Sequence, residues 1–227
     1  MPPTPTPKRH PYNQWAPDAR ALDLVGDKWT LLIVRDLAAG PRRFVELQRV
    51  LPGISTEQLR SRLNRMVADG LLTRQRYREV PPRVDYELTA RSKALLPVVG
   101  ALARWGYDWA WTAPRESEAI DIGAILRVAP GLVKFPPSIG GVANLEVRVD
   151  ATTTRHYTLT VDRGSVAISE TEHAVADAFV SGSQDDWIDA LGPGADRSGL
   201  TIDGDQRLAS VLLDAVGAVA ERGIRVA

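Results

Sequence analysis

Glycine and proline residues divide residues 17–70 into short segments, and this division most limits what the chain can fold into. The boundaries are Pro17, Gly26, Gly40-Pro41, Pro52-Gly53 and Gly70. Proline cannot continue a helix, and glycine suits the left-handed position that ends one. Because the apolar residues between the boundaries have helical spacing, the pattern predicts four short helices. They lie at residues 18–25, between Asp27 and Gly40, at residues 45–51, and between Ser55 and Gly70.

The fourth predicted helix has an apolar stripe and a polar face. Ser55 opens it, and Gln58 three residues later completes a capping box. At 100° per residue the stripe consists of Leu59, Leu63, Met66 and Val67. The side chains that face away from it are Glu57, Gln58, Ser61, Asn64 and Arg65, with Arg60 and Arg62 at its flanks. These groups can read base edges in a major groove, although an ordinary solvated surface is the better explanation for a helix considered by itself.

Residues 71–88 predict a hairpin directly after this helix. Residues 71–78 are extended and basic, residues 80–83 form a turn, and Val84, Tyr86 and Leu88 alternate with the period of a strand. Helix, turn, helix and a two-stranded ribbon is the order of a winged helix-turn-helix module. In such a module phosphate contacts set the register, and the second helix contacts bases. The hairpin therefore favours the DNA-reading interpretation of the polar helix face.

Charge separates the two halves of the chain, although 28 Lys+Arg and 28 Asp+Glu cancel in total. Residues 1–112 hold 18 basic and 11 acidic side chains, a net of +7, whereas residues 113–227 hold 10 and 17, a net of −7. Residues 42–83 alone hold 10 basic and 4 acidic side chains, a net of +6. This concentration indicates a polyanion partner, and a solvated basic face is the alternative.

Residues 12–106 resemble the HxlR family of winged-helix transcription regulators, within the broader MarR-like group. The segments that carry the resemblance are 19–26, 28–33, 40–44, 51–55, 69–72 and 79–89, together with Leu59, Arg62 and Leu63. The resemblance implies a homodimer on a double-stranded DNA operator, with the helix from Ser55 in the major groove and with Arg43 and Arg83 on phosphates. The predicted DNA-binding residues are Arg42, Arg43, Ser55, Thr56, Gln58, Arg60, Ser61, Arg62, Arg65, Arg76 and Arg83.

Two positions depart from the family pattern. Many relatives have a cysteine before the proline that matches Pro17, and some of them sense oxidants or electrophiles with it. This chain has Ala16 there and no cysteine at all, which excludes thiol sensing, disulfides and thiolate metal sites. Ser92 stands shortly after the wing, where the family often has glycine, and the sequence gives no functional reason for it.

A helical run over residues 90–111 has an apolar seam with alternating steps of three and four residues. Pro97 predicts a bend, or a helix that starts only a few residues earlier. The resemblance implies dimerisation through this run and the N-terminal arm, and packing onto the acidic half of the same chain is the alternative. The predicted dimerisation residues are Trp15, Leu95, Val98, Leu102, Trp105 and Trp109. We therefore expect an arm at residues 1–16 and a mainly α winged helix-turn-helix domain at residues 17–111.

Residues 119–227 predict an α+β domain with a roughly five-stranded sheet, after a polar linker at residues 112–118. A helix is expected at 122–129, strands at 145–149, 157–161, 166–168, 178–181 and 200–202, a helix after Ser183, and a closing helix at 208–219. This region contains Val180-Ser181-Gly182-Ser183, then Trp187, and then the segment 199–205 before a Leu-rich helix. In this order of motifs, residues 119–222 are similar to the sterol-carrier-protein family. The resemblance implies a pocket for a small apolar or lipid-like ligand, and a solid core is an equal alternative. The pocket residues would be Ile125, Phe179, Trp187, Leu191 and Leu212.

The sequence predicts no catalytic site, metal site or cofactor. The three histidines are scattered without metal-ligand spacing, and Gly192-Pro193-Gly194 lacks the third glycine and the preceding strand of a nucleotide-binding loop. The longest apolar stretch, residues 94–103, is too short to span a membrane, and the N-terminus lacks the apolar run of a signal peptide. We therefore expect a cytoplasmic protein without a membrane partner.

These patterns together predict a sequence-specific, homodimeric, double-stranded DNA-binding regulator of transcription that is not an enzyme. A small apolar ligand in the C-terminal domain would modulate it by changing the separation of the two recognition helices. The alternative is a lipid or acyl carrier protein whose N-terminal module serves only as an assembly platform.

Overall fold

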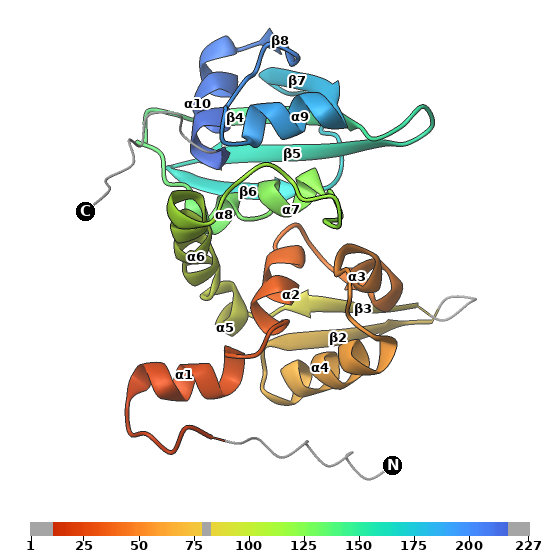
Figure 1. Cartoon of the computed structure of the whole chain (residues 1–227), viewed down its shortest axis with the longest axis vertical. Coiled ribbons are helices and arrows are strands. Elements are labelled where there is room, and N and C mark those ends of the chain that lie inside the picture. Colours follow the sequence, from red (N-terminus) through yellow and green to blue (C-terminus); the bar gives the residue numbers. More distant parts are fainter. Residues whose placement is uncertain (1–10, 79–82, 218–227) are drawn as a thin grey trace. The chain divides into compact units, whose positions relative to one another are not determined.

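The computed structural model describes residues 11–78 and 83–217, and it divides into two units, one up to Leu95 and one from Leu96 (Figure 1). In the first unit the helices are α1 (Pro17–Val25), α2 (Thr30–Asp36), α3 (Phe44–Val50), α4 (Thr56–Ala68) and α5 (Ala90–Lys93), and the strands are β1 (Arg42–Arg43), β2 (Leu72–Tyr77) and β3 (Arg83–Leu88). In the second unit the helices are α6 (Leu96–Trp109), α7 (Ile122–Leu126), α8 (Ala129–Leu132), α9 (Gln184–Leu191) and α10 (Gln206–Val216). Its strands are β4 (Gly141–Arg148), β5 (Thr154–Asp162), β6 (Ser165–Ser169), β7 (Ala178–Ser183) and β8 (Thr201–Gly204).

The four helices predicted between Pro17 and Gly70 are confirmed as α1 to α4. The carboxylate of Asp27 accepts the backbone N–H groups of Trp29 at 2.9 Å and Thr30 at 3.1 Å at the start of α2. The backbone N–H of Gln58 donates to the Ser55 hydroxyl at 3.2 Å, and the backbone N–H of Ser55 donates to Gln58 Oε1 at 3.1 Å. The capping box of α4 is therefore formed as the sequence predicts.

The predicted hairpin is confirmed as β2 and β3, which pair antiparallel with Leu72 opposite Leu88 and Tyr77 opposite Arg83. Its expected turn falls largely on residues 79–82, outside the described residues. Among the described residues β1 adds a third strand in the order β1-β3-β2, with Arg42 opposite Tyr86. The sequence did not predict β1, because two residues carry no alternation by which a strand could be identified.

The core of the first unit lies between this small sheet and the helices. Ile33, Leu47, Leu59 and Leu63 are completely buried. Val67, expected in the apolar stripe of α4, is only half-buried. Burial of the remaining stripe orients α4, so that its polar residues face outward.

The helical run predicted over residues 90–111 forms two helices, α5 and α6. Helix α6 starts one residue before Pro97, which confirms the predicted helix start close to this proline. Ser92 is completely buried in α5, and its hydroxyl donates to the carbonyl of Leu71 at 2.6 Å. This bond fastens α5 to the start of the wing. Glycine could not make it, which gives Ser92 the structural reason that the sequence did not provide.

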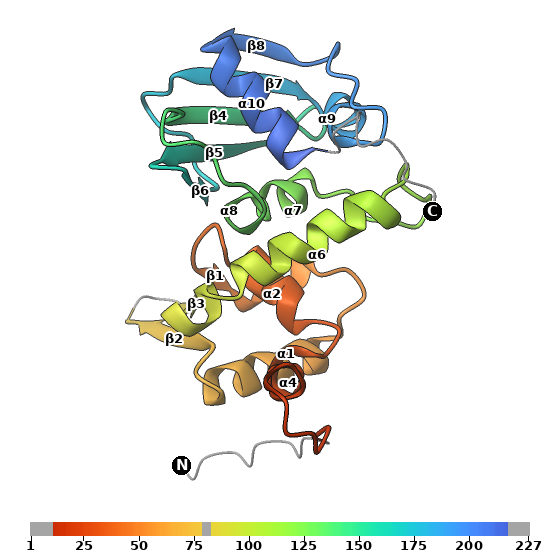
Figure 2. The same ribbon diagram turned by 90° about the vertical axis from the view of Figure 1, so that its left-hand side faces the viewer.

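Strands β4 to β8 form one sheet within residues 141–204 of the described chain, in the order β6-β5-β4-β7-β8 (Figure 2). All neighbouring pairs are antiparallel except β4 and β7, which run parallel. Helices α9 and α10 pack against β4 and β7, and the side chains buried beneath them include Leu145, Val147 and Val180. The expected α+β region with a five-stranded sheet is therefore present among the described residues, whereas the sterol-carrier fold stays a prediction.

Two boundaries in the second unit differ from the prediction. The helix expected at residues 122–129 is divided into α7 and α8, and Pro130 lies in the first turn of α8, where its missing N–H removes no helical hydrogen bond. Helix α6 groups with the second unit, whereas we expected it to close the first domain. The last expected helix is α10, and the part of it predicted beyond residue 217 lies outside the described residues.

Candidate nucleic-acid interface

The outward face of α4 and the N-cap before it hold most of the predicted base-reading residues. Ser55, Thr56, Gln58 and Arg60 are exposed, as is Asn64, while Ser61 and Arg65 are half-buried. Leu59, Leu63 and Met66 on the opposite side are buried. The structure therefore brings amide, hydroxyl and guanidinium groups together on one accessible helix face, as the sequence predicts.

Two side chains on this face are already positioned by hydrogen bonds. Gln48 on α3 donates its amide N–H to the Thr56 hydroxyl at 2.8 Å, so the Thr56 hydroxyl hydrogen can still be donated. The Oε1 atom of Gln58 accepts the capping bond from Ser55, which leaves its NH2 group as a donor. The sequence did not identify Gln48, because a contact between neighbouring helices leaves no periodic pattern.

The arginines of α4 differ in how deeply their ion pairs within the protein are buried. Arg60 forms an ion pair with Glu57 at 3.1 Å, and the two side chains are 60% and 79% exposed. Arg62 forms an ion pair with Asp27 at 2.8 Å, and these side chains are only 18% and 23% exposed. Arg62 therefore ties α4 to the start of α2, so its role is to position the helix, and the DNA-binding role given to it by the sequence stays untested.

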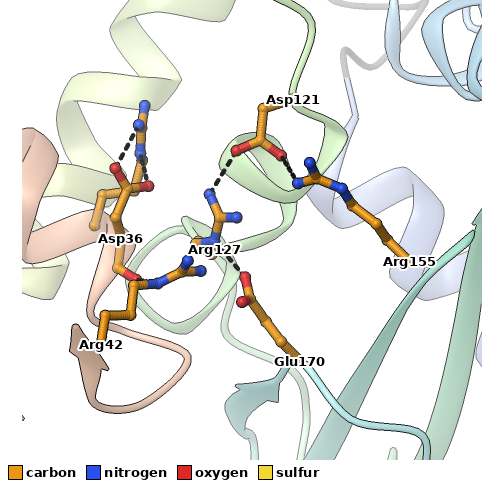
Figure 3. A network of polar contacts seen from close by, with 7 residues as sticks. Asp36, Arg42, Asp121, Arg127, Arg155 and Glu170 are labelled. Carbon is orange, nitrogen blue, oxygen red and sulfur yellow. Dashed lines mark hydrogen bonds and ion pairs between the residues drawn. The ribbon is translucent and has the colours of Figure 1, made fainter. Parts of the chain in front are cut away.

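Arg42, predicted to bind DNA, is 9% exposed and lies in β1. Its Nε donates to the backbone carbonyl of Asp36 at 2.7 Å, and Figure 3 shows the Arg42 side chain beside Asp36. Adjacent residues of a strand point to opposite sides, so Arg42 is buried and Arg43 is exposed. The sequence could not distinguish the two, because it did not predict β1. Burial removes Arg42 from the accessible surface, and we correct its role to a structural one.

Arg43 and Arg83, the two predicted phosphate contacts, converge on Asp85. Arg83 donates to both carboxylate oxygens of Asp85 at 2.6 and 2.9 Å, and Arg43 Nε lies 4.0 Å from Asp85 Oδ1. Hydrogen bonds from Arg83 hold the pKa of the buried Asp85 carboxyl below its usual value, against the opposing effect of burial. Asp85 therefore stays ionised at neutral pH and fixes both guanidinium groups, which are 48% and 38% exposed.

The wing adds a row of exposed cations. Arg74, Arg76 and Arg78 are exposed along β2 and directly after it, and Arg83 lies over the ring of Tyr77 at 5.3 Å from its centre. Only Arg76 of the β2 residues was placed in the predicted site. Arg74 lies on the same face of β2 as Arg76, because alternate residues of a strand share a face.

The predicted dimerisation residues on α6 form an exposed apolar face. Val98, Leu102, Trp105 and Trp109 are 49% to 71% exposed. Leu95, which precedes α6 and ends the first unit, is half-buried. In the first unit, Trp15 is 94% exposed. Exposed apolar side chains of this size at helical spacing favour a partner surface.

The five predicted pocket residues do not line one pocket in the described structure. Trp187, Leu191 and Leu212 are completely or almost completely buried, and Trp187 Nε1 donates to the carbonyl of Glu146 at 2.9 Å. Phe179 is 41% exposed, because it alternates with the buried Ala178 and Val180 and so points to the opposite face of the sheet. Ile125 is half-buried on α7. The core alternative accounts for the first three residues, and the predicted lining is wrong for Phe179.

A buried ionic cluster occupies another part of the second unit. Arg127, 1% exposed, forms ion pairs with Asp121 at 2.9 Å and Glu170 at 2.7 Å, and Asp121 lies 3.6 Å from Arg155 (Figure 3). Burial, followed by the charge of Asp121, raises the pKa of the neighbouring Tyr157. Because the charges compensate one another, the cluster joins α7 to the segment after β6 and has a structural role.

Within the described residues no group of three or more His, Asp or Glu side chains is arranged to hold a metal ion. No helix in the same part of the chain has the length and apolar character to cross a membrane.

Comparison with known proteins identifies the family. The family model described as HxlR-like helix-turn-helix matches residues 24–113. The HTH-type transcriptional regulator sll1512 of Synechocystis sp. is 42% identical over 41% of this chain and 69% of its own length, and YvaP of Bacillus subtilis is 36% identical over 40% and 83%. The structure of the redox regulator HypR in its oxidized form is 35% identical over 40% of this chain and 94% of its own, with a TM-score of 0.39. On the family match and the curated relatives, this chain belongs to the HxlR-like helix-turn-helix family of transcriptional regulators.

Proposed function

We propose that the chain is a homodimeric regulator that binds a specific double-stranded DNA site through α4 and the wing. The observation that carries this proposal is the outward polar face of α4, held in one unit with the exposed Arg74 and Arg76 of β2. A helix fits the major groove, and amide and guanidinium groups match the donors and acceptors on base edges. The net charge of +6 over residues 42–83 also favours binding to the negatively charged phosphates of DNA.

In the proposed complex the two parts of the interface have different tasks. Gln58, Arg60 and Asn64 contact base edges, and the Gln58 amide acts as a donor because its oxygen caps the helix. Arg43, Arg83 and the β2 arginines contact phosphates and set the register of α4. Asp85 holds the first two guanidinium groups in place, which lowers the entropy lost on binding.

We propose that dimerisation uses the exposed apolar face of α6, with Trp15 as a second contribution. One winged unit contacts few base pairs, whereas two copies can read half-sites about 34 Å apart, which is one turn of the duplex. Burial of Leu102, Trp105 and Trp109 would supply large apolar areas to the dimer. A ligand of the second unit would then regulate by favouring a dimer in which the two α4 helices have another spacing.

The test is selection of binding sites from a pool of random duplexes by the full chain. The expected product is a repeated half-site with centres about 10 base pairs apart. Leu102→Lys, which places a charge in the apolar face of α6, should give a monomer that selects single half-sites weakly. Ser210→Lys, at an exposed position of α10, is the matched control and should behave like the parent. Selection of no duplex would contradict the proposal and would favour the carrier alternative.

A further inference from the structure

A half-open groove of about 570 Å³ lies within the second unit, between α6, the segment after α8, and α10. Its apolar walls include Pro97 and Ala101 of α6, Leu132 and Phe135 after the glycine of α8, and Ala215 of α10. Sites for small molecules in proteins commonly have volumes of about 300–1,000 Å³. The groove is separate from the predicted pocket, since its lining contains none of the five residues proposed from the sequence.

Two cations border the groove. Arg104 Nη2 donates to the carbonyl of Leu132 at 2.7 Å, which holds the guanidinium in place while its other N–H groups can still donate. Lys134 is exposed at the same groove. Two acids, Asp108 and Asp214, also lie in the lining, and Asp214 pairs with Arg197 at 2.7 Å. The groove therefore combines apolar walls with two cationic side chains, Arg104 and Lys134, that a bound anion can contact.

Tyr107 contributes a neutral wall to the groove. Its hydroxyl donates to the carbonyl of Val216 at 2.6 Å, and burial raises the pKa of Tyr107 to about 12. The phenol therefore adds no negative charge that would oppose an anion at any physiological pH.

We propose that this groove binds a small carboxylate with an apolar body, the carboxylate against Arg104 and Lys134 and the apolar body along Ala101, Leu132 and Ala215. Charge-assisted hydrogen bonds from two cations would orient the acid, and burial of its apolar part would supply the remaining affinity. An acid of this class goes beyond the apolar ligand implied by the sequence, because the groove supplies charge that a neutral lipid would leave unused.

The position of the groove also gives the proposed ligand a route to regulation. Arg104 and Trp105 are neighbours on α6, one bordering the groove and the other on the exposed apolar face. A bound acid would therefore contact the helix that we propose to form the dimer. This regulatory consequence rests on the proposed function, whereas binding of the acid does not.

The test is isothermal titration of the full chain with sodium octanoate, with 1-octanol as the uncharged probe and with no DNA present. Octanoate should bind, and octanol should bind at least tenfold more weakly. Lys134→Gln, a change of an exposed side chain, should weaken octanoate binding about fivefold to tenfold, since tenfold corresponds to 1.4 kcal/mol. Arg207 is an exposed cation of α10 outside the groove, and Arg207→Gln should leave the affinity for octanoate unchanged.

Ala101→Trp provides a second variant, because it fills the groove without removing charge. It should abolish octanoate binding while the circular dichroism spectrum stays that of the parent. The proposal is overturned if octanoate does not bind, if octanol binds equally well, or if Lys134→Gln and Ala101→Trp both bind like the parent. Because no outcome depends on DNA, a failure here is distinct from a failure of the proposed function.

Discussion

Arg62 on α4 and Asp27 before α2 are joined by an ion pair of 2.8 Å between Nη1 and Oδ2. Asp27 also accepts the backbone N–H groups of Trp29 and Thr30 and the Thr30 hydroxyl. One carboxylate therefore starts α2 and also holds α4. The orientation of the outward face of α4 depends on this residue as well as on apolar packing.

Loss of this pair should destabilise the protein. Arg62→Ala is expected to lower the free energy of unfolding by about 1–2 kcal/mol, because it leaves the half-buried Asp27 without its charged partner. Arg60→Ala is the matched control, since its pair with Glu57 is exposed, and should cost less than about 0.5 kcal/mol. Urea unfolding measures both values. Equal losses in the two variants would contradict the positioning role of Arg62.

Asp85 should make the stability of the wing depend on pH. Hydrogen bonds from Arg83 lower the pKa of Asp85 below its ordinary value of 3.8 in the folded protein. The pair therefore stabilises the fold at pH values above the unfolded pKa, and this contribution is lost as the pH falls through the folded pKa. Asp85→Asn should lower the free energy of unfolding by about 2 kcal/mol at neutral pH.

The same variant should show a smaller difference from the parent in acid. Urea unfolding of both proteins near neutral pH and below about pH 4 measures the change. A difference that stays constant, or that grows as the pH falls, would show that Asp85 does not act as the ionised partner of Arg83.

Gln58 should contribute to sequence discrimination through its amide donor. Gln58→Glu keeps an oxygen for the capping bond to Ser55 but removes the NH2 group, so α4 should remain folded while preference among DNA sequences falls. Gln58→Ala should relax the preference too, and should also destabilise the helix by about 0.5–1 kcal/mol, because the Ser55 N–H loses its bond to Gln58 Oε1 while the Ser55 cap stays in place. Competition between the selected duplex and random DNA is the measurement. Unchanged preference in both variants would remove Gln58 from the base contacts.

Gly100 and Gly131 let α6 and α8 approach at backbone distance. A Cβ atom on Gly100 would overlap the Gly131 carbonyl, and one on Gly131 would overlap the Leu96 carbonyl. Gly100→Ala should therefore lower the free energy of unfolding by about 1–3 kcal/mol. Gly106→Ala on the same helix meets open space and should raise it by about 0.5–1 kcal/mol. Thermal unfolding measures both changes. Shifts of the melting temperature in the same direction for the two variants would contradict the close crossing of α6 and α8.

Helix starts in this chain could be predicted because their interactions are local. Asp27 and Ser55 reach backbone groups two or three residues away, and Gln58 returns the bond to Ser55. The alternation of Val84, Tyr86 and Leu88 likewise identified β3. Because such patterns span only a few neighbouring residues, the amino-acid sequence alone is enough to locate α4 and the wing along the chain.

Contacts between distant segments could not be predicted in this way. Arg42 is buried because β1 pairs with Tyr86, far along the chain, and nothing near Arg42 distinguishes it from the exposed Arg43. Because both side chains are apolar, the sequence predicts the same role for Phe179 and Trp187. In the structure Phe179 is exposed on one face of the sheet, whereas Trp187 is buried in the core. The groove beside Arg104 joins three segments of the second unit, none of which carries a ligand motif.

The most direct test of the account measures the affinity of the full chain for its selected duplex as a function of salt. Fluorescence anisotropy of the labelled duplex should show an affinity that falls by about 10³ to 10⁵ between 50 and 200 mM salt, because several arginines displace counterions from phosphates. Arg76→Ala should weaken binding to all sequences and reduce the slope of log K against log salt by about one, whereas Arg207→Ala should not change it. Affinity that is indifferent to salt, or no binding to the duplex even at low salt, would contradict the claim that α4 and the wing bind DNA.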